Sequence, residues 1–163
     1  MVEDESLRDL AGEHVQSLRY LAAALAVAVA FMHISHARLG FPRLVVHLQV
    51  GTLFDPRPLL FTLSALAILV GILIAWNGIA RRPIYAAGAL LMVSYLLGYA
   101  AWHTVLDHGA FWPHIEGHGH HDAGTLEIVV SHLRDDLWAL SSKLLELATL
   151  VVLLVLLVVD RPE

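Results

Sequence analysis

Four long apolar runs restrict the fold of this chain more than any other feature of its sequence. They lie at about residues 18–39, 58–77, 84–106 and 126–159 of a chain that is 58% hydrophobic and only 15% charged. A helix needs about 20 apolar residues to cross the hydrocarbon core of a bilayer. Inside lipid, such a helix satisfies its own backbone hydrogen bonds. The sequence therefore predicts an all-α integral membrane protein, a four-transmembrane-helix antiparallel bundle in a single membrane domain, residues 1–163.

The segments between the spans complete this prediction. Residues 1–17 are polar and acidic, with apolar residues at helical spacing, which favours a polar N-terminal helix and a retained anchor over a signal peptide. Residues 40–57 contain an apolar stretch too short to span, so we expect an interfacial segment after the first span. Residues 107–125 form a His-rich loop. Leucines at near-heptad spacing in residues 126–159 predict one long helix that contains the fourth span.

Orientation and partners follow from the distribution of charge. Four spans place both termini on one side, and five arginines against four favour cytoplasmic termini and an extracytoplasmic His-rich loop. The expected location is the cell membrane, with the lipid bilayer as surroundings and with a homo-oligomer or other subunits of a membrane complex as possible partners. A net charge of −5 gives no reason to expect nucleic-acid binding. The absence of cysteine excludes thiolate metal sites and iron–sulfur clusters.

Histidines are concentrated at one predicted membrane face. Seven of the eleven lie between Trp102 and Asp136. Because successive spans alternate in direction, the ends of spans one and three, the start of the last helix and the loop all meet at this face. Only His14 is expected at the opposite face, so the histidines divide ten to one. Neutral imidazole and carboxylate groups bind borderline and harder metals, and this division predicts a metal centre.

The predicted ligands come from three helix ends and the loop. The inner set is His33, His36, His103 and Asp107, and the next candidates are His108, His132 and Asp136, with the loop residues His118, His120 and His121. Three histidines with one carboxylate suit zinc, whereas other arrangements suit copper, nickel or iron. A metal-bound water would make hydrolysis possible, but no motif identifies a substrate, and the reaction stays unknown.

Other functions fit the same residues. A b-type haem in a subunit of a respiratory or electron-transfer complex would use His33 or His36 and His103 or His108 as axial ligands. A metal-ion transport or accessory protein would capture ions at the loop and pass them to intramembrane groups that include Glu146. In a purely structural subunit the histidines would only hydrogen-bond across helix ends. Lys143 and Glu146, three residues apart, form either a structural ion pair or part of a proton path.

Overall fold

In a computed structural model, every regular element of the described residues, 2–51, 55–107 and 124–160, is a helix. Side chains are described from residue 14 onward. The helices are α1 (Val2–Ser35), α2 (Phe41–Val50), α3 (Arg57–Trp76), α4 (Arg81–His103), α5 (Thr125–Asp135) and α6 (Leu137–Val159). The prediction of an all-α protein is confirmed for this part of the chain.

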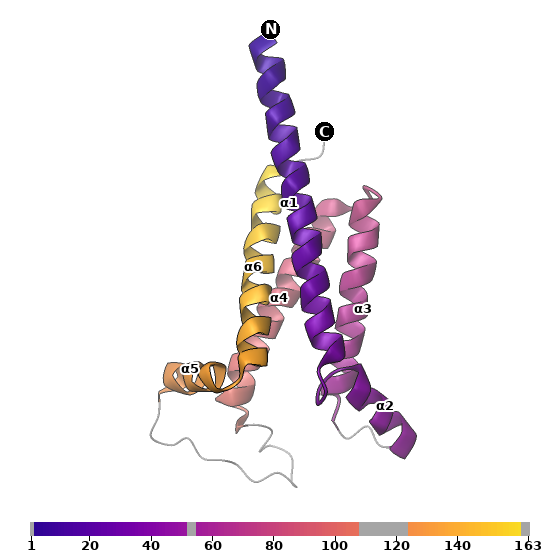
Figure 1. Ribbon diagram of the computed structural model, residues 1–163, viewed down its shortest axis with the longest axis vertical. Coiled ribbons are helices and arrows are strands. Elements are labelled where there is room, and N and C mark those ends of the chain that lie inside the picture. Colours follow the sequence, from indigo (N-terminus) through magenta and orange to yellow (C-terminus); the bar gives the residue numbers. More distant parts are fainter. Residues whose placement is uncertain (1, 52–54, 108–123, 161–163) are drawn as a thin grey trace.

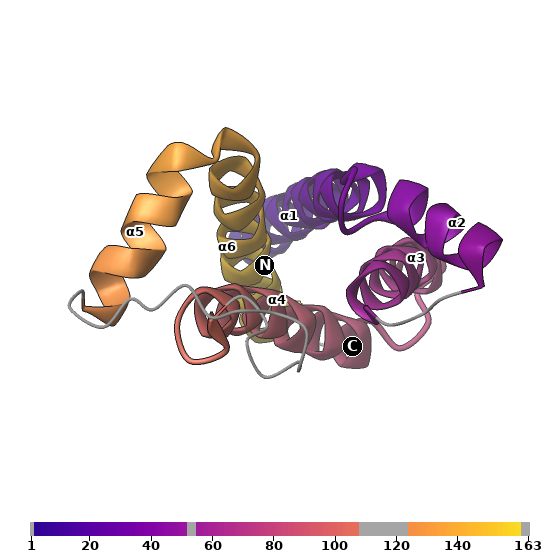
Figure 2. The same ribbon diagram turned by 90° about the horizontal axis from the view of Figure 1, so that it is seen from below.

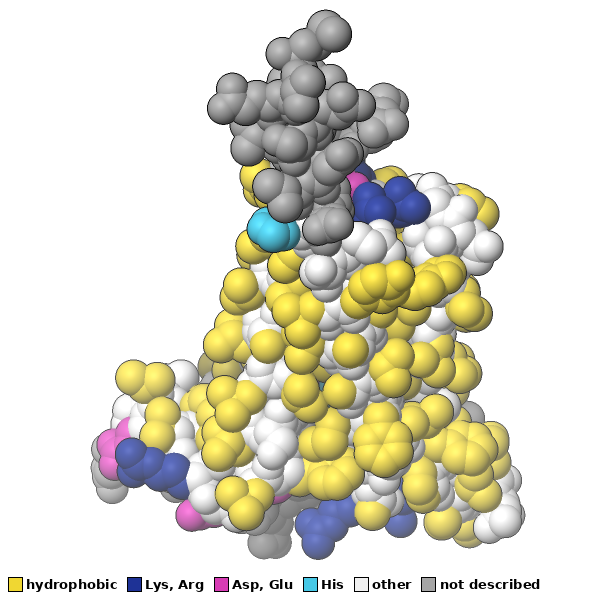
Figure 3. All heavy atoms as spheres, turned by 45° about the horizontal axis from the view of Figure 1, so that its top comes forward, with side chains coloured by type: hydrophobic (Ala, Val, Ile, Leu, Met, Phe, Trp, Pro, Cys, Tyr) yellow, Lys and Arg dark blue, Asp and Glu magenta, His cyan; other side chains and the backbone are white. Residues whose placement is uncertain are grey.

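Four of these helices are long and apolar enough to cross a membrane. They are α3, α4, α6 and the His14–Ser35 part of α1. Large apolar side chains such as Leu73, Leu90 and Val158 point outward and are exposed, whereas buried positions include several polar residues. Figure 3 shows the apolar surface over the helices, with charged side chains gathered toward their ends. A soluble domain would bury its large apolar side chains, and this arrangement is typical of a protein surrounded by lipid.

Helix α6 packs most extensively against α4 and α1, and α1 packs in turn against α3. Figures 1 and 2 show the four long helices side by side around a common centre, with α2 and α5 turned outward at one end. Two buried apolar clusters fill part of this centre, one around Leu156 and Ala22 and the other around Met92 and Ala65. The alanines let neighbouring helices approach closely.

A polar clamp joins three helices at the end where α6 terminates. Arg19 of α1 donates two hydrogen bonds to Asp160, Nε to Oδ2 at 2.9 Å and Nη2 to Oδ1 at 2.6 Å. Tyr85 of α4 donates a third to Oδ2 at 2.8 Å. The bonds from Arg19, and then that from Tyr85, hold the pKa of Asp160 below its usual value even though burial opposes this. Beyond the clamp, α1 extends away from the other helices (Figure 1).

Gly40 makes the tight connection between α1 and α2. Its amide donates to the carbonyl oxygen of His36 at 2.7 Å. A Cβ atom at this position would lie 2.5 Å from the carbonyl oxygens of both His33 and Ile34, so only glycine fits. This connection fixes where α1 ends and directs α2 away from α1.

The segment expected to form one long helix, residues 126–159, instead forms two helices that meet at Asp136. The backbone of Asp136 is extended, with φ −124° and ψ 98°. Its side chain accepts hydrogen bonds from the amides of Trp138 and Ala139 at 2.9 and 3.1 Å, which makes it the N-cap of α6. The chain turns sharply at this capped start of α6, so that α5 points outward from the long helices, as Figure 1 shows.

Candidate functional site

A buried charge cluster lies among the long helices, centred on Glu146 of α6. The side chain of Glu146 has no exposed surface. Its carboxylate accepts two hydrogen bonds from Lys143 Nζ, at 2.6 and 2.7 Å. Oε1 also accepts from Ser142 Oγ at 2.9 Å and lies 3.0 Å from His33 Nε2. Because an ionised carboxylate only accepts, Nε2 of His33 carries the proton in this arrangement.

Lys143 points into the protein. Its side chain is 13% exposed, and Nζ contacts the carbonyl oxygen of Tyr95 at 3.4 Å as well as Glu146. Nζ lies 5.2 Å from the centre of the Tyr99 ring, within reach of a cation–π interaction. The structural ion pair with Glu146, one of the two roles that the sequence spacing suggested, is therefore present.

Aromatic rings enclose the imidazole of His33. The Tyr95 ring stacks on it with centroids 4.0 Å apart and planes 17° apart, and the Phe61 ring lies 4.8 Å away. The Tyr95 hydroxyl donates to Ser64 on α3. The cluster thus joins side chains of α1, α3, α4 and α6. Its net charge is zero with a neutral imidazole, because one carboxylate balances one ammonium group.

A second group of polar side chains lies where the end of α4 meets the last turn of α5. The His103 ring of α4 lies 4.4 Å from the His132 ring of α5, with planes 43° apart. Tyr99, one turn earlier on α4, contacts His103 at 4.4 Å between ring centroids. His132 Nδ1 lies 2.8 Å from the carbonyl oxygen of Ile128, to which it donates as an N–H. That bond leaves Nε2 as the acceptor nitrogen of the neutral ring.

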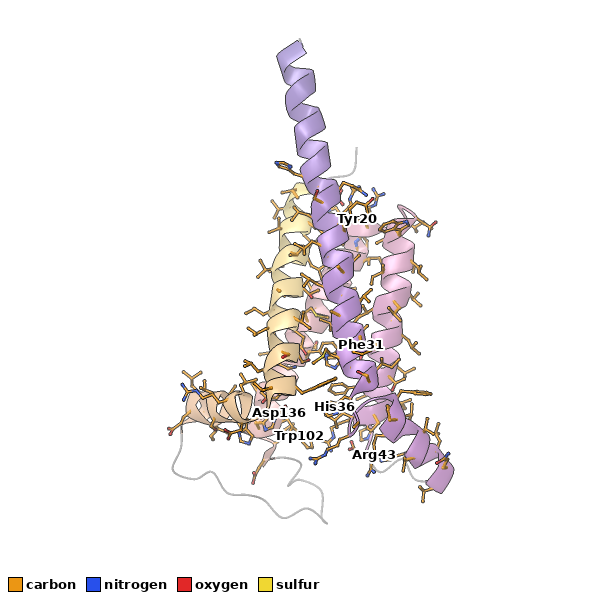
Figure 4. The ribbon with its side chains drawn as sticks, in the orientation of Figure 1. Tyr20, Phe31, His36, Arg43, Trp102 and Asp136 are labelled. Carbon is orange, nitrogen blue, oxygen red and sulfur yellow. The ribbon has the colours of Figure 1, made fainter. Side chains whose placement is uncertain are left out.

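His36 and Asp136 lie at the same end, as the labelled side chains in Figure 4 show. His36 Nδ1 accepts hydrogen bonds from the amides of Arg38 and Leu39, both at 3.2 Å. The His36 and Trp138 rings pack edge to face, with centroids 6.1 Å apart and planes 85° apart. Burial lowers the pKa of His36, and attraction to Asp136 opposes that shift. Because Nδ1 accepts these two bonds, the neutral ring carries its proton on Nε2, and metal binding through Nδ1 would replace the bonds to the amides.

An ion pair and a buried histidine complete this end. The Arg57 guanidinium donates three hydrogen bonds to the Asp55 carboxylate, the shortest 2.7 Å, and the Arg57 amide donates a fourth. Burial raises the pKa of Asp55, but the bonds from Arg57 outweigh burial and the net pKa is lowered. The Arg57 guanidinium lies 3.9 Å from the Trp102 ring centre. His47 of α2 is buried, and its Nδ1 has no hydrogen-bond partner in the described part of the chain.

The structure divides the predicted ligands between two places. His33 lies in the buried charge cluster, whereas His103 and His132 form a pair at the helix ends. Asp107 follows His103, the last residue of α4, by four positions in the sequence. Among the described side chains, no three His, Asp or Glu residues form a group that could hold a metal ion. His36 and Asp136 lie at the same end as this pair. The other four candidates, His108, His118, His120 and His121, lie outside the described residues.

The contact between His33 and Glu146 was missed in the sequence analysis. The two residues are 113 positions apart, so no local spacing connects them. A signal did exist, since ionisable residues in otherwise apolar spans face the interior and pair with one another. That rule predicts a shared interior for His33, Lys143 and Glu146, although it does not fix which atoms meet.

The chain was compared with known protein families, with curated proteins and with solved structures, and nothing in any of the three matches it.

Proposed function

We propose that this chain is a multi-pass membrane metalloprotein that binds a transition metal ion at the face where the end of α4 meets the last turn of α5. The four long helices would form an antiparallel bundle across the cell membrane, with α2 in the interface. The termini would be cytoplasmic and the His-rich segment extracytoplasmic. The packing of α6 against both α1 and α4 supports the bundle.

The observation that carries the metal proposal is the pair His103 and His132. Two imidazoles that share a tetrahedral zinc ion, with Zn–N distances of about 2.0–2.1 Å, have ring centroids roughly 5 Å apart. The observed separation of 4.4 Å is close to that value. The bond from His132 Nδ1 to the Ile128 carbonyl is the second contact by which proteins orient a metal-binding imidazole.

Two further groups at this face favour a cation. The Asp136 carboxylate attracts positive charge there, and the His36 imidazole, whose pKa burial lowers, lies beside it. The segment that joins α4 to α5 adds His108, His114, His118, His120 and His121 in the sequence. We propose His103 and His132 as the first ligands, with His36, Asp107, Asp136 and the segment's histidines as the groups from which the others come. Imidazole and carboxylate donors suit zinc, copper, nickel or iron.

The b-type haem alternative has less support. His33, one of its possible axial ligands, directs Nε2 at Glu146 and stacks on Tyr95. Ligation through Nε2 would break the bond to Glu146 and leave that carboxylate with one donor fewer. Transport of metal ions into the buried cluster is also less favoured, because the Lys143 ammonium already occupies the position of a cation beside Glu146.

The test is metal binding by the full, untagged chain in detergent. After chelator treatment, Zn²⁺, Cu²⁺, Ni²⁺ and Fe²⁺ are titrated separately, with calorimetry and thermal unfolding as readouts. His103→Ala and His132→Ala should each weaken the binding at least tenfold, since even loss of a supporting contact costs about 10–100-fold. His14→Ala, an exposed position on α1 at the other end, is the matched control and should leave the affinity unchanged.

A variant with His118, His120 and His121 all replaced by alanine separates an ordered centre from weak binding by the loop. If His103→Ala and His132→Ala bind as the unaltered chain does while this triple variant loses all binding, the proposed centre is wrong. Retention of tight binding by the triple variant, together with its loss in the two single variants, supports the helix-held site.

A further inference from the structure

A cavity of about 490 Å³ lies between α1, α3, α4 and α6, in the half of the helices nearer the Arg19–Asp160 clamp. Its volume falls within the range of about 300–1,000 Å³ that ligand pockets occupy. Its inner end is formed by Met92 and Thr149, the latter one helical turn from Glu146. The cavity is therefore separate from the histidine pair at the opposite end.

The walls of the cavity are made of small apolar residues. Ala23, Ala26, Gly71, Ala87 and Gly88 are among its lining, and their short side chains leave the space between the helices open. Ala67 of α3 and Ala87 of α4 line the cavity and are exposed, and α3 packs less extensively against α4 than against α1. We place the opening between α3 and α4. Water occupies apolar cavities poorly, so a hydrocarbon chain suits these walls better.

The mouth of the cavity has a different chemistry. Gln16, Arg19, Trp76, Arg81 and Tyr85 line this end, where α3 ends and α4 begins. Tyr20 packs against Trp76 with ring centroids 5.4 Å apart. Aromatic rings of this kind are enriched at the level of lipid head groups. The mouth thus lies where a membrane lipid would place its polar part.

Among the described side chains, positive charge is in excess at the mouth. Asp160 balances the charge of Arg19. The hydrogen bond of Arg81 goes to the carbonyl oxygen of Ala75 at 3.3 Å, and that of Arg82 goes to the carbonyl oxygen of Leu157 at 3.2 Å. Arg19, Arg81, Arg82 and Asp160 together carry a net charge of +2 at this end of the described structure, and Arg19 and Arg81 line the cavity itself. A basic pocket between membrane helices is the arrangement that binds anionic head groups.

We propose that this cavity binds a phospholipid with an anionic head group, one acyl chain lying between α3 and α4 and the phosphate beside Arg81. The proposal does not depend on the metal centre, because the two sites share no residue. The acyl chain would add apolar packing between four helices that small side chains keep apart, and the phosphate would supply a counter-charge to Arg81.

Native mass spectrometry and thermal unfolding of the full chain in detergent test this proposal, with phosphatidylglycerol and phosphatidylcholine of the same acyl chains as probes. Phosphatidylglycerol should bind more tightly and raise the unfolding temperature more. Arg81→Gln should weaken its binding about fivefold, given the roughly 1 kcal/mol that one basic side chain contributes near anionic lipid. Ala87→Leu, which fills the cavity, should weaken the binding of both lipids.

Adjacent residues provide matched controls. Arg82 and Ala86 are exposed neighbours that do not line the cavity. Arg82→Gln and Ala86→Leu should therefore bind phosphatidylglycerol more tightly than Arg81→Gln and Ala87→Leu do. Equal binding of the two lipids, or equal losses in the control and test variants, would overturn the proposal. So would displacement of bound phosphatidylglycerol by an uncharged isoprenoid quinone at equal concentration, because the cavity would then select the apolar chain alone.

Discussion

Replacing Glu146 with glutamine should destabilise the protein strongly. Glu146 is fully buried and accepts hydrogen bonds from Lys143, Ser142 and His33. Glu146→Gln keeps the size of the side chain but removes its charge, which leaves the Lys143 ammonium without a counter-charge among apolar helices. Breaking a buried ion pair in this way costs about 3–5 kcal/mol. Lys143→Gln should cost a similar amount, because it leaves the carboxylate unbalanced.

The double variant distinguishes an ion pair from two independent contacts. In Lys143→Gln with Glu146→Gln neither charge remains, and two amides can still hydrogen-bond. We expect the loss of unfolding free energy in the double variant to be smaller than the sum of the two single losses by about 2 kcal/mol. Interaction energies between residues in contact range from about 0.5 to 3 kcal/mol. The measurement is reversible unfolding in mixed detergent micelles at neutral pH, followed by circular dichroism.

Two results would refute the reasoning about this cluster. A change below about 0.5 kcal/mol for Glu146→Gln is the size expected of an ordinary surface substitution and would mean that the carboxylate is not buried with the ammonium. Strict additivity in the double variant would mean that the two side chains do not interact.

Two further predictions concern the ends of the helices. Asp136→Ala should remove the N-cap of α6 and lower the free energy of unfolding by about 0.5–2 kcal/mol, with faster hydrogen exchange at the amides of Trp138 and Ala139. Asp135→Ala, at the exposed neighbouring position, is the control. Equal hydrogen exchange in the two variants would contradict the capping role. Asp160 has a lower pKa in the folded protein than in the unfolded chain, where its pKa is about 3.9. The clamp therefore contributes its full stabilisation above that unfolded pKa, and this stabilisation is lost as the pH falls through the folded pKa. Asp160→Asn should therefore lower the unfolding temperature at neutral pH. It should also make the unfolding temperature fall less steeply as the pH is lowered. If the unfolding temperature of the variant falls as steeply in acid as that of the unaltered chain, Asp160 does not contribute to stability in this way.

The helical class and the membrane-length helices could be predicted because they depend on composition and run length alone. Residues 58–77 and 84–106, for example, were predicted as spans, and α3 and α4 occupy nearly the same positions. The break at Asp136 was missed because the leucine spacing continues across it. The aspartate directly before an apolar run was nevertheless a start signal for a helix.

The candidate site was predictable only in part. The alternation of helix direction brought His103 and His132 to one end of the structure, and those two residues are in contact. The same alternation could not distinguish His33 from these two, because His33 also lies near this end, in the last turn of α1, but its ring points inward to Glu146. A ring direction depends on which partner on another helix lies within reach, and that information is not contained in the spacing of histidines along the chain.

Elemental analysis of the untagged, detergent-purified protein tests the central claim most directly. The account predicts about one zinc, copper, nickel or iron ion per chain without a haem absorption band, with the metal lost in His103→Ala and His132→Ala and kept in His14→Ala. A haem band would contradict the proposed centre, and so would a metal content that is the same in all three variants or absent even after the protein is saturated with these ions and dialysed.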